Sequence, residues 1–258
     1  MSKLTHRIEK KAVEILVDRI MAERNPADRQ KKLKRLSYVM QHLFGDLFEK
    51  ESFDDARRLI DEGGKWFRFL NTALDTLNPH VVKTAVMDLG FEAGFYGLRT
   101  RDAAKAKYHC NIPWAILFDP TSACNLHCIG CWAAEYGHTL NLSFDVMDKI
   151  VREGKALGCH FYLLTGGEPL MRKKDILRLC RKHPDCEFHA FTNGTLIDDA
   201  FCDEVTDVGN LSFSLSIEGF REVNDSRRGE GDFDKVMHAM DLLRKHRIAL
   251  CDAGSSEV

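Results

Sequence analysis

The sequence has no long apolar segment. None of its uninterrupted apolar runs reaches the roughly 18 residues that a membrane-spanning helix needs. Its start, MSKLTHRIEKK, also lacks the apolar stretch of a secretory signal. We therefore expect a protein that does not contact membranes and that resides in the cytoplasm.

The sequence also has no excess of either charge. It contains 37 Lys and Arg residues against 39 Asp and Glu residues, which gives a formal net charge of −2. A near-neutral chain exerts no broad attraction on phosphate backbones. Nucleic acid is therefore not an expected partner.

Low-complexity tracts and sequence repeats of 20–50 residues are absent as well. With 258 residues, 44% of them hydrophobic and 29% charged, the chain has the composition of a globular protein of one or two domains. Its nine cysteines are an odd number in a chain without an export signal. Metal binding, redox chemistry or simple burial therefore explains them better than a disulfide framework does.

Residues 1–110 have the periodicity of helices. Pro26, the pair Gly63 and Gly64, and Pro79 divide them into about four helices. Between residues 33 and 48 the apolar residues recur at steps of three and four, which predicts one helical packing face. These residues are Leu33, Leu36, Val39, Met40, Leu43, Phe44, Leu47 and Phe48.

After Pro113 short β-branched and aromatic runs alternate with helical patterns, which predicts βα units with a parallel sheet. Strands are expected at 114–118, 160–164, 187–191 and 211–217, with a fifth beginning at Ile248. Helices are expected near 144–157, 174–182, 198–205 and 233–246. We place the boundary between a helical region, 1–110, and an α/β region, 111–258, at this change.

Three cysteines stand close together directly after the first predicted strand. Within DPTSACNLHCIGC, Cys124, Cys128 and Cys131 form a C-x3-C-x2-C array, which a loop can curl around one metal centre. An iron–sulfur cube can be held by three thiolates, whereas a structural zinc site normally takes four ligands. The count of three favours a cluster. A zinc site completed by His127, or three inert thiols, stays open at this point.

This array, on the loop after the first strand of a βα repeat, resembles the signature of the radical S-adenosylmethionine (SAM) superfamily. The resemblance implies a [4Fe–4S] cluster on the three cysteines, whose fourth iron chelates the amino and carboxylate groups of SAM. In that family, an electron from the cluster cleaves SAM to a 5′-deoxyadenosyl radical that abstracts hydrogen. The residue before the third cysteine is often aromatic in the family and is Gly130 here, although this position is not a ligand.

The second predicted strand ends in a glycine turn, Gly166, Gly167, Glu168 and Pro169. Glycine permits both the turn and a close approach of the backbone to a ligand, although an ordinary strand-to-helix turn has the same composition. The segment is similar to the GGEP motif of the family. That resemblance implies that its backbone and its acidic side chain receive the amino group of SAM.

The third predicted strand ends in Thr192, Asn193 and Gly194, which taken alone indicates a polar turn before a capped helix. Family members often carry a TNG segment at this place. The resemblance implies that Thr192 and Asn193 face the cavity in which SAM lies.

On the fourth predicted strand Ser212, Ser214 and Ser216 alternate with apolar residues, so that one face of the strand carries hydroxyl groups. A polar cavity against this face would explain them. SLSIEG and the later RRGEGDFDKV resemble family segments that imply Ser216 and Arg228 as contacts of the SAM carboxylate and ribose. Arg227 competes with Arg228 for that role, and a simple surface cation is the alternative for either of them.

Members of this family usually form a partial (β/α) barrel of six units. The resemblance covers residues 113–250 and supplies four units and the start of a fifth. We therefore expect an incomplete partial barrel of radical SAM type, preceded by an all-helical region and apparently truncated after about four units. An uncovered parallel edge is prone to aggregation, which adds to this expectation. Two alternatives stay open at this point: the N-terminal helices cover the exposed face, or a partner supplies the missing units.

The leading hypothesis is an enzyme that cleaves SAM reductively, in the maturation of a peptide or of a cofactor. It implies two cofactors, the [4Fe–4S] cluster and SAM, and two partners, a reducing electron donor and a substrate that is a peptide or a small-molecule precursor. No side chain is assigned a catalytic role. A truncated, non-catalytic iron–sulfur protein and a zinc-stabilised interaction module are the alternatives.

Overall fold

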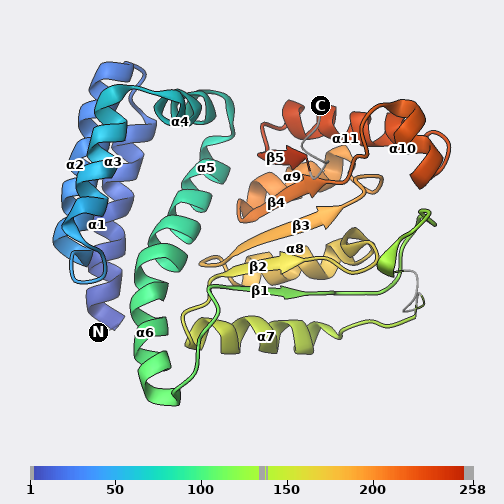
Figure 1. The fold of residues 1–258 in the computed structure, drawn as a ribbon, viewed down its shortest axis with the longest axis horizontal. Helices are drawn as coiled ribbons and strands as arrows, with labels where there is room; N and C mark the ends of the chain where they lie inside the picture. The colour runs from blue at the N-terminus through green and yellow to red at the C-terminus, as the bar shows by residue number, and fades with distance from the viewer. Residues whose placement is uncertain (1–2, 134–136, 138, 253–258) are drawn as a thin grey trace.

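The computed structural model describes residues 3–133, 137 and 139–252. Helices come first in the chain and a parallel sheet with its own helices follows, as Figure 1 shows. This confirms the predicted fold class, an incomplete α/β barrel preceded by helices. Within the described residues, no helix is long and apolar enough to cross a membrane.

The first part of the chain is entirely helical. Its helices are α1 (Lys3–Met21), α2 (Pro26–Phe44), α3 (Lys50–Glu62), α4 (Lys65–Thr76), α5 (Pro79–Ala85), the π-helix η1 (Val86–Tyr96) and α6 (Gly97–Tyr108). Asn25 caps α2 by accepting the N–H of Ala27, and Pro26 follows at the first helical position. Gly63 ends α3 with φ +59°, a conformation that glycine adopts without strain.

Because α5, η1 and α6 follow one another without a break, the described residues form five continuous helical segments here. The prediction of about four helices missed one interruption. The chain leaves α2 after Phe44 and begins α3 at Lys50, so the packing face predicted over residues 33–48 ends early. Leu47 and Phe48 instead turn back onto the helical core, where the Phe48 ring lies 5.4 Å from that of Phe95. Aromatic packing decided this turn, and periodicity alone does not report it.

The second part contains a sheet of five parallel strands. They are β1 (Ala115–Phe118), β2 (Phe161–Leu164), β3 (Glu187–Thr192), β4 (Leu211–Leu215) and β5 (Leu250–Asp252). Their order in the sheet is their order in the chain, as in a (β/α) barrel and unlike a doubly wound sheet. All five predicted strands are present, with the fifth beginning at Leu250 instead of Ile248.

Helices cover one face of this sheet. They are α7 (Phe144–Ala156), α8 (Lys173–Lys182), α9 (Asp199–Val208) and α11 (Asp232–Lys245). The 3₁₀ helix η3 (Pro169–Arg172) follows β2, and α10 (Arg221–Arg228) follows β4 beyond the carboxyl ends of the strands. Alternate strand residues such as Phe188 and Phe213 are fully buried against them. On the opposite face Leu117 is 57% exposed. The sequence did not predict α10, whose REVNDSRR contains only one apolar residue.

The helical part is tied to the start of β2 through α6. Arg101 is buried and donates from Nη1 to the carbonyls of Ala93 and Gly158, at 3.0 and 2.7 Å. A Cβ on Gly158 would lie 2.5 Å from the carbonyl oxygen of Gly97, so only glycine allows this contact.

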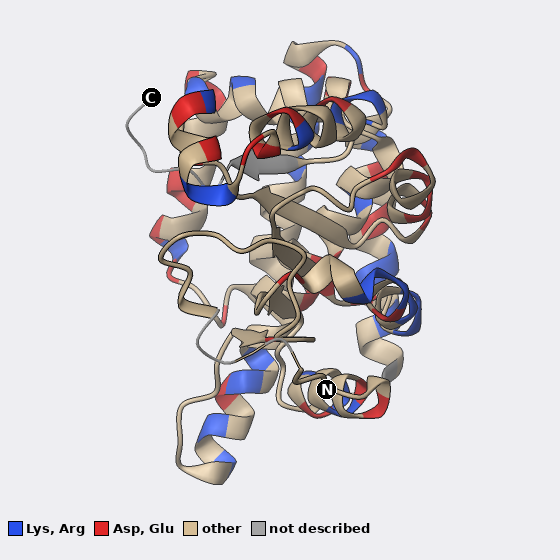
Figure 2. Ribbon diagram, turned by 90° about the vertical axis from the view of Figure 1, so that its right-hand side faces the viewer, with Lys and Arg blue, Asp and Glu red and all other residues tan. Residues whose placement is uncertain are grey.

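Acidic and basic residues are mixed along the helices (Figure 2). The division into residues 1–110 and 111–258 stays a prediction.

Candidate functional site

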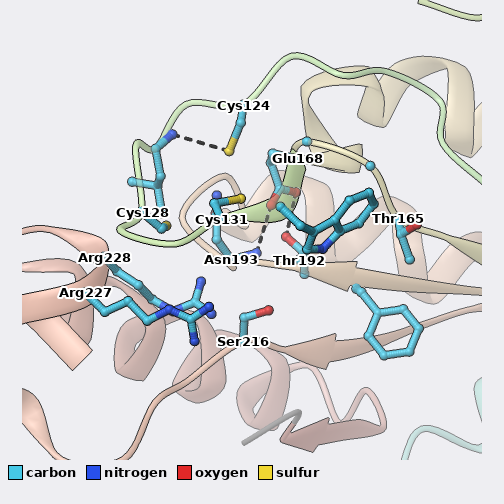
Figure 3. Close-up of a pocket in the computed structure, with 15 residues that line it drawn as sticks. Cys124, Cys128, Cys131, Thr165, Glu168, Thr192, Asn193, Ser216, Arg227 and Arg228 are labelled. Carbon is cyan, nitrogen blue, oxygen red and sulfur yellow. Dashed lines mark hydrogen bonds between the residues drawn. The ribbon is translucent and has the colours of Figure 1, made fainter. Parts of the chain in front are cut away.

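The three clustered cysteines lie on the loop between β1 and α7. Cys124, Cys128 and Cys131 are all partly exposed, and all three line one cavity of about 300 Å³ at the carboxyl ends of the strands. Parallel (β/α) sheets place their functional sites at this end. Figure 3 shows the thiols on one side of the cavity and two arginines on the other.

Burial and the neighbouring arginines act in opposite directions on the pKa of Cys128. Burial raises the pKa of Cys124 and of Cys128. The guanidinium groups of Arg228 and Arg227 oppose this rise at Cys128, because a nearby cation favours the thiolate. The cavity thus contains positive charge opposite the residues that would have to bind metal as thiolates.

The remaining described cysteines lie elsewhere. Cys159, Cys180, Cys186 and Cys202 are buried in the core of the α/β part, and Cys110 is exposed after α6. This burial is typical of cysteines that act as small apolar side chains. Cys110 is therefore a suitable control position for experiments on the cavity cysteines.

The glycine turn packs against the start of the cysteine loop. The N–H of Gly167 donates to Thr121 O at 3.0 Å, and that of Glu168 donates to Ala123 O at 2.8 Å. A Cβ on Gly166 would lie 2.4 Å from Thr121 O. The glycines are thus explained by the close approach of two backbone segments, both of which border the cavity.

Replacement of Gly167 by alanine is expected to destabilise the fold. The new Cβ would lie 2.3 Å from Ala123 O, a backbone atom that cannot turn away. Overpacking of this kind costs roughly 1–3 kcal/mol, measured as the loss in free energy of urea unfolding. The control is Gly90→Ala inside the π-helix η1, where a Cβ has nothing within 4 Å and the cost should stay below about 0.5 kcal/mol. Equal losses in both variants would contradict the role of this contact.

Glu168 is buried, and its carboxylate is engaged within the protein. It accepts hydrogen bonds from Leu170 N–H at 2.9 Å, from Thr192 Oγ1 at 2.6 Å and from Asn193 N–H at 2.8 Å. Burial raises the pKa of Glu168, and these three bonds counteract the rise. Glu168 therefore joins the ends of β2 and β3. Pro169, which was expected at the site, begins η3 behind the turn and is not part of the cavity lining.

Asn193 connects the end of β3 to the cysteine loop. Its Nδ2 donates to Asn125 Oδ1 at 2.9 Å, and Asn125 Nδ2 donates in turn to Thr195 Oγ1 at 2.7 Å. Thr192 and Asn193 also line the cavity, beside the cysteines. Asn125 was not singled out from the sequence, although its place directly after Cys124 is a signal that could have found it.

The helix α10 brings two arginines to the far side of the cavity. Arg227 Nη1 and Arg228 Nη2 donate to the two carboxylate oxygens of Glu218, at 2.6 and 2.5 Å. Ile129, inside the cysteine loop, donates its N–H to Arg227 O at 2.8 Å. Both arginines and Ser216 line the cavity. Sequence reasoning missed Glu218, which follows Ser216 in the same SIEG segment.

Only one of the three alternating serines, Ser216 directly after β4, lies in the cavity. Ser216 lines it, whereas Ser212 and Ser214 both contact the ring of His189 on β3. The alternation of serines predicted one polar cavity against all three, but the cavity explains Ser216 alone. The other two belong to a separate hydrogen-bonded group.

The donor set of the loop fits an iron–sulfur cluster. Within residues 3–133, 137 and 139–252, no three His, Cys, Asp or Glu side chains converge closely enough to hold a single metal ion. A cubane cluster is larger than an ion, and each thiolate binds a different iron atom. The three thiols that line the cavity can supply one ligand to each of three iron atoms.

Comparison with known proteins connects this cavity to a family. The family described as the Radical SAM superfamily matches residues 118–253, more than half of the chain. The matched part includes the cysteine loop, the glycine turn and the ends of β3 and β4.

Three curated relatives are similar over the same part. The AdoMet-dependent heme synthase of Methanosarcina barkeri is 30% identical, over 52% of this chain and 40% of that protein. The Fe-coproporphyrin III synthase of the same organism is 33% identical, over 48% and 32%. The serine-type anaerobic sulfatase-maturating enzyme of Klebsiella aerogenes is 29% identical, over 53% and 38%. The similarity thus spans between about a third and two fifths of the length of these relatives.

Proposed function

The chain belongs to the radical SAM superfamily, and from this premise we propose that it binds a [4Fe–4S] cluster on Cys124, Cys128 and Cys131 and SAM in the adjoining cavity. When bound and reduced, the cluster supplies the electron that cleaves SAM. The observation that carries the proposal is the single cavity, which combines the three thiols with the glycine turn, the end of β3 and the arginines of α10.

We assign each group of cavity residues a separate role in holding SAM or in positioning the site. Gly166 and Gly167 border it with backbone, which leaves room for a ligand beside the cysteine loop. Ser216 and Arg228 supply a hydroxyl and a cation suited to the carboxylate and ribose of SAM. Glu168, whose oxygens are already bonded to β3 and η3, acts mainly by holding the turn in place.

The proposed reaction belongs to the maturation of a peptide or of a cofactor. Support comes from the relatives, whose names describe heme synthesis and sulfatase maturation. An electron donor is required because cleavage of SAM is reductive. Residues 1–110 are proposed as a separate helical region and residues 111–258 as the catalytic core.

The proposal can be tested by electron paramagnetic resonance. The full chain is reconstituted anaerobically with iron and sulfide, reduced with dithionite, and measured with and without SAM. We expect a cubane signal that SAM perturbs, because one iron without a protein ligand is free to bind it. A signal unchanged by SAM would favour a non-catalytic iron–sulfur protein, and bound zinc without sulfide would favour an interaction module.

A further inference from the structure

The sheet face opposite the helices carries a second polar group, separate from the cysteine cavity. The strand registers place Leu117, Leu163, His189 and Ser212 in one row across β1, β2, β3 and β4. We call the face that carries this row the inner face. Its β1–β2 half is apolar and its β3–β4 half is hydrogen-bonding. Strands β1 to β4 contain no Lys or Arg.

Four side chains of the inner face form a chain of hydrogen bonds. Ser214 Oγ lies 2.8 Å from His189 Nε2, and His189 Nδ1 lies 3.0 Å from Ser212 Oγ. Ser212 Oγ donates to Glu187 Oε1 at 3.0 Å. Glu187 is 2% exposed, and its second oxygen, Oε2, has no hydrogen-bond partner. This series of hydrogen bonds thus ends at a buried carboxyl group, whose Oε2 atom can carry a proton.

These hydrogen bonds can run in either direction. Burial lowers the pKa of His189, so that the ring is neutral and has one donor and one acceptor nitrogen. When Glu187 is ionised, Ser212 donates to it, and every hydrogen bond of the series is donated in the direction of Glu187. When Glu187 holds a proton, it donates to Ser212, and every bond reverses to end on the Ser214 hydroxyl. Reversal of the hydrogen bonds thereby lets Glu187 lose a proton at one end while the Ser214 hydroxyl gives up a proton at the other, or the reverse.

Burial favours the protonated form of Glu187. Burial raises the pKa of Glu187 to about 8. Its surroundings contain Asp88 of η1, whose pKa burial and the Glu187 charge also raise to about 8, and Lys10 of α1, which counteracts that rise. A proton donor with a pKa close to the working pH is the most effective kind.

The Ser214 end of this series of hydrogen bonds lies beside the cysteine cavity. Ser214 is paired with Phe191, which lines that cavity, and the Phe191 ring lies 5.2 Å from the ring of His189. Ser216, also in the cavity lining, follows directly after the end of β4 (Figure 3). The hydrogen bonds therefore lead from the buried base of the sheet to the side of the cavity.

We propose that Glu187, Ser212, His189 and Ser214 form a proton relay that gives a proton to an oxygen or sulfur atom of a substrate on the inner face. The proposal rests on the proposed function of the neighbouring cavity. The O–H bond of Glu187 breaks, a bond forms between hydrogen and the substrate atom, and the negative charge moves to Glu187. The apolar half and the lack of cations on these strands fit a substrate with an apolar body and no phosphate groups.

The test uses 4-nitrophenolate, an apolar ring with one anionic oxygen whose visible absorbance disappears on protonation. The full chain is added in excess at a fixed neutral pH, and bound probe is measured by equilibrium dialysis. We expect the absorbance to fall in proportion to the bound probe. Glu187→Gln and His189→Gln should abolish this fall while changing the bound amount less than about twofold. His238→Gln, at an exposed position on α11, should behave as the wild type.

Absence of binding to the wild-type chain would overturn the proposal, as would a fall in absorbance that persists in Glu187→Gln. Circular dichroism confirms that the variants are folded, and Glu187→Gln preserves the size of the side chain. The measurement needs neither reductant nor SAM. Loss of the cluster signal with an intact nitrophenol response would therefore reject the proposed function alone, and the reverse result would reject the relay alone.

Discussion

Replacement of Cys128 by alanine is expected to abolish the reduced-cluster signal of the reconstituted chain. With three thiols on the loop, removal of one leaves too few ligands to hold a cubane. Loss of groups that merely support a metal ligand already costs about 10–100-fold in affinity, so loss of a ligand should lower iron and sulfide content at least tenfold. Metal analysis and electron paramagnetic resonance measure both quantities on the same sample.

The matched control is Cys110→Ala, because Cys110 is exposed and lies outside the cavity lining. It should retain the wild-type iron content and the wild-type response to SAM. If Cys128→Ala keeps a full signal that SAM perturbs, the assignment of the ligands to this loop is wrong. Equal loss in both variants would point to general cysteine damage during reconstitution.

Replacement of Glu187 by glutamine is expected to stabilise the protein in alkaline solution. Burial raises the pKa of Glu187 from 4.5 to about 8. Between these two values the folded chain retains a proton that the unfolded chain releases, so the stability of the wild type falls as pH rises through this window. At 1.36 kcal/mol per pKa unit, the penalty above pH 8 is at most about 5 kcal/mol. Glutamine does not ionise and avoids this penalty.

Urea unfolding at several pH values measures this effect. The unfolding free energy of Glu187→Gln should exceed that of the wild type by roughly 2–5 kcal/mol above pH 8 and should vary less with pH between 4.5 and 8. The control is Glu230→Gln at an exposed position, which should leave the pH dependence unchanged. Parallel pH curves for the wild type and Glu187→Gln would show that Glu187 ionises normally in the folded chain.

The strands could be predicted because each is a short apolar run between turn residues. The limits of β1 to β4 differ from expectation by a residue or two, since edge residues such as Ile217 fit a strand pattern equally well outside the sheet. The helix α10 could not be predicted. Its stability depends on tertiary bonds, such as that from buried Asn224 to Asp232, and not on an apolar stripe.

Among the site residues, those within short contiguous motifs were predictable. The cysteine array and the glycine turn are fully visible in the sequence, because the chemistry needs those residue types at fixed local spacing. Asn125 and Glu218 were not found. Asn125 joins segments 68 residues apart through its bond to Asn193, and Glu218 bonds the end of α10, a helix that the sequence did not predict.

By itself, the sequence determined the order of helices and strands, the three cysteines and the motifs that end β2 and β3. These features depend on residue type and local spacing. Only the tertiary structure decided that the arginines of α10 face the thiols, that Glu168 is bonded to β3, and that Ser212 and Ser214 pair with His189. Such contacts arise where strand register and helix packing bring distant segments together. Their energies depend on burial and distance, which no local pattern contains.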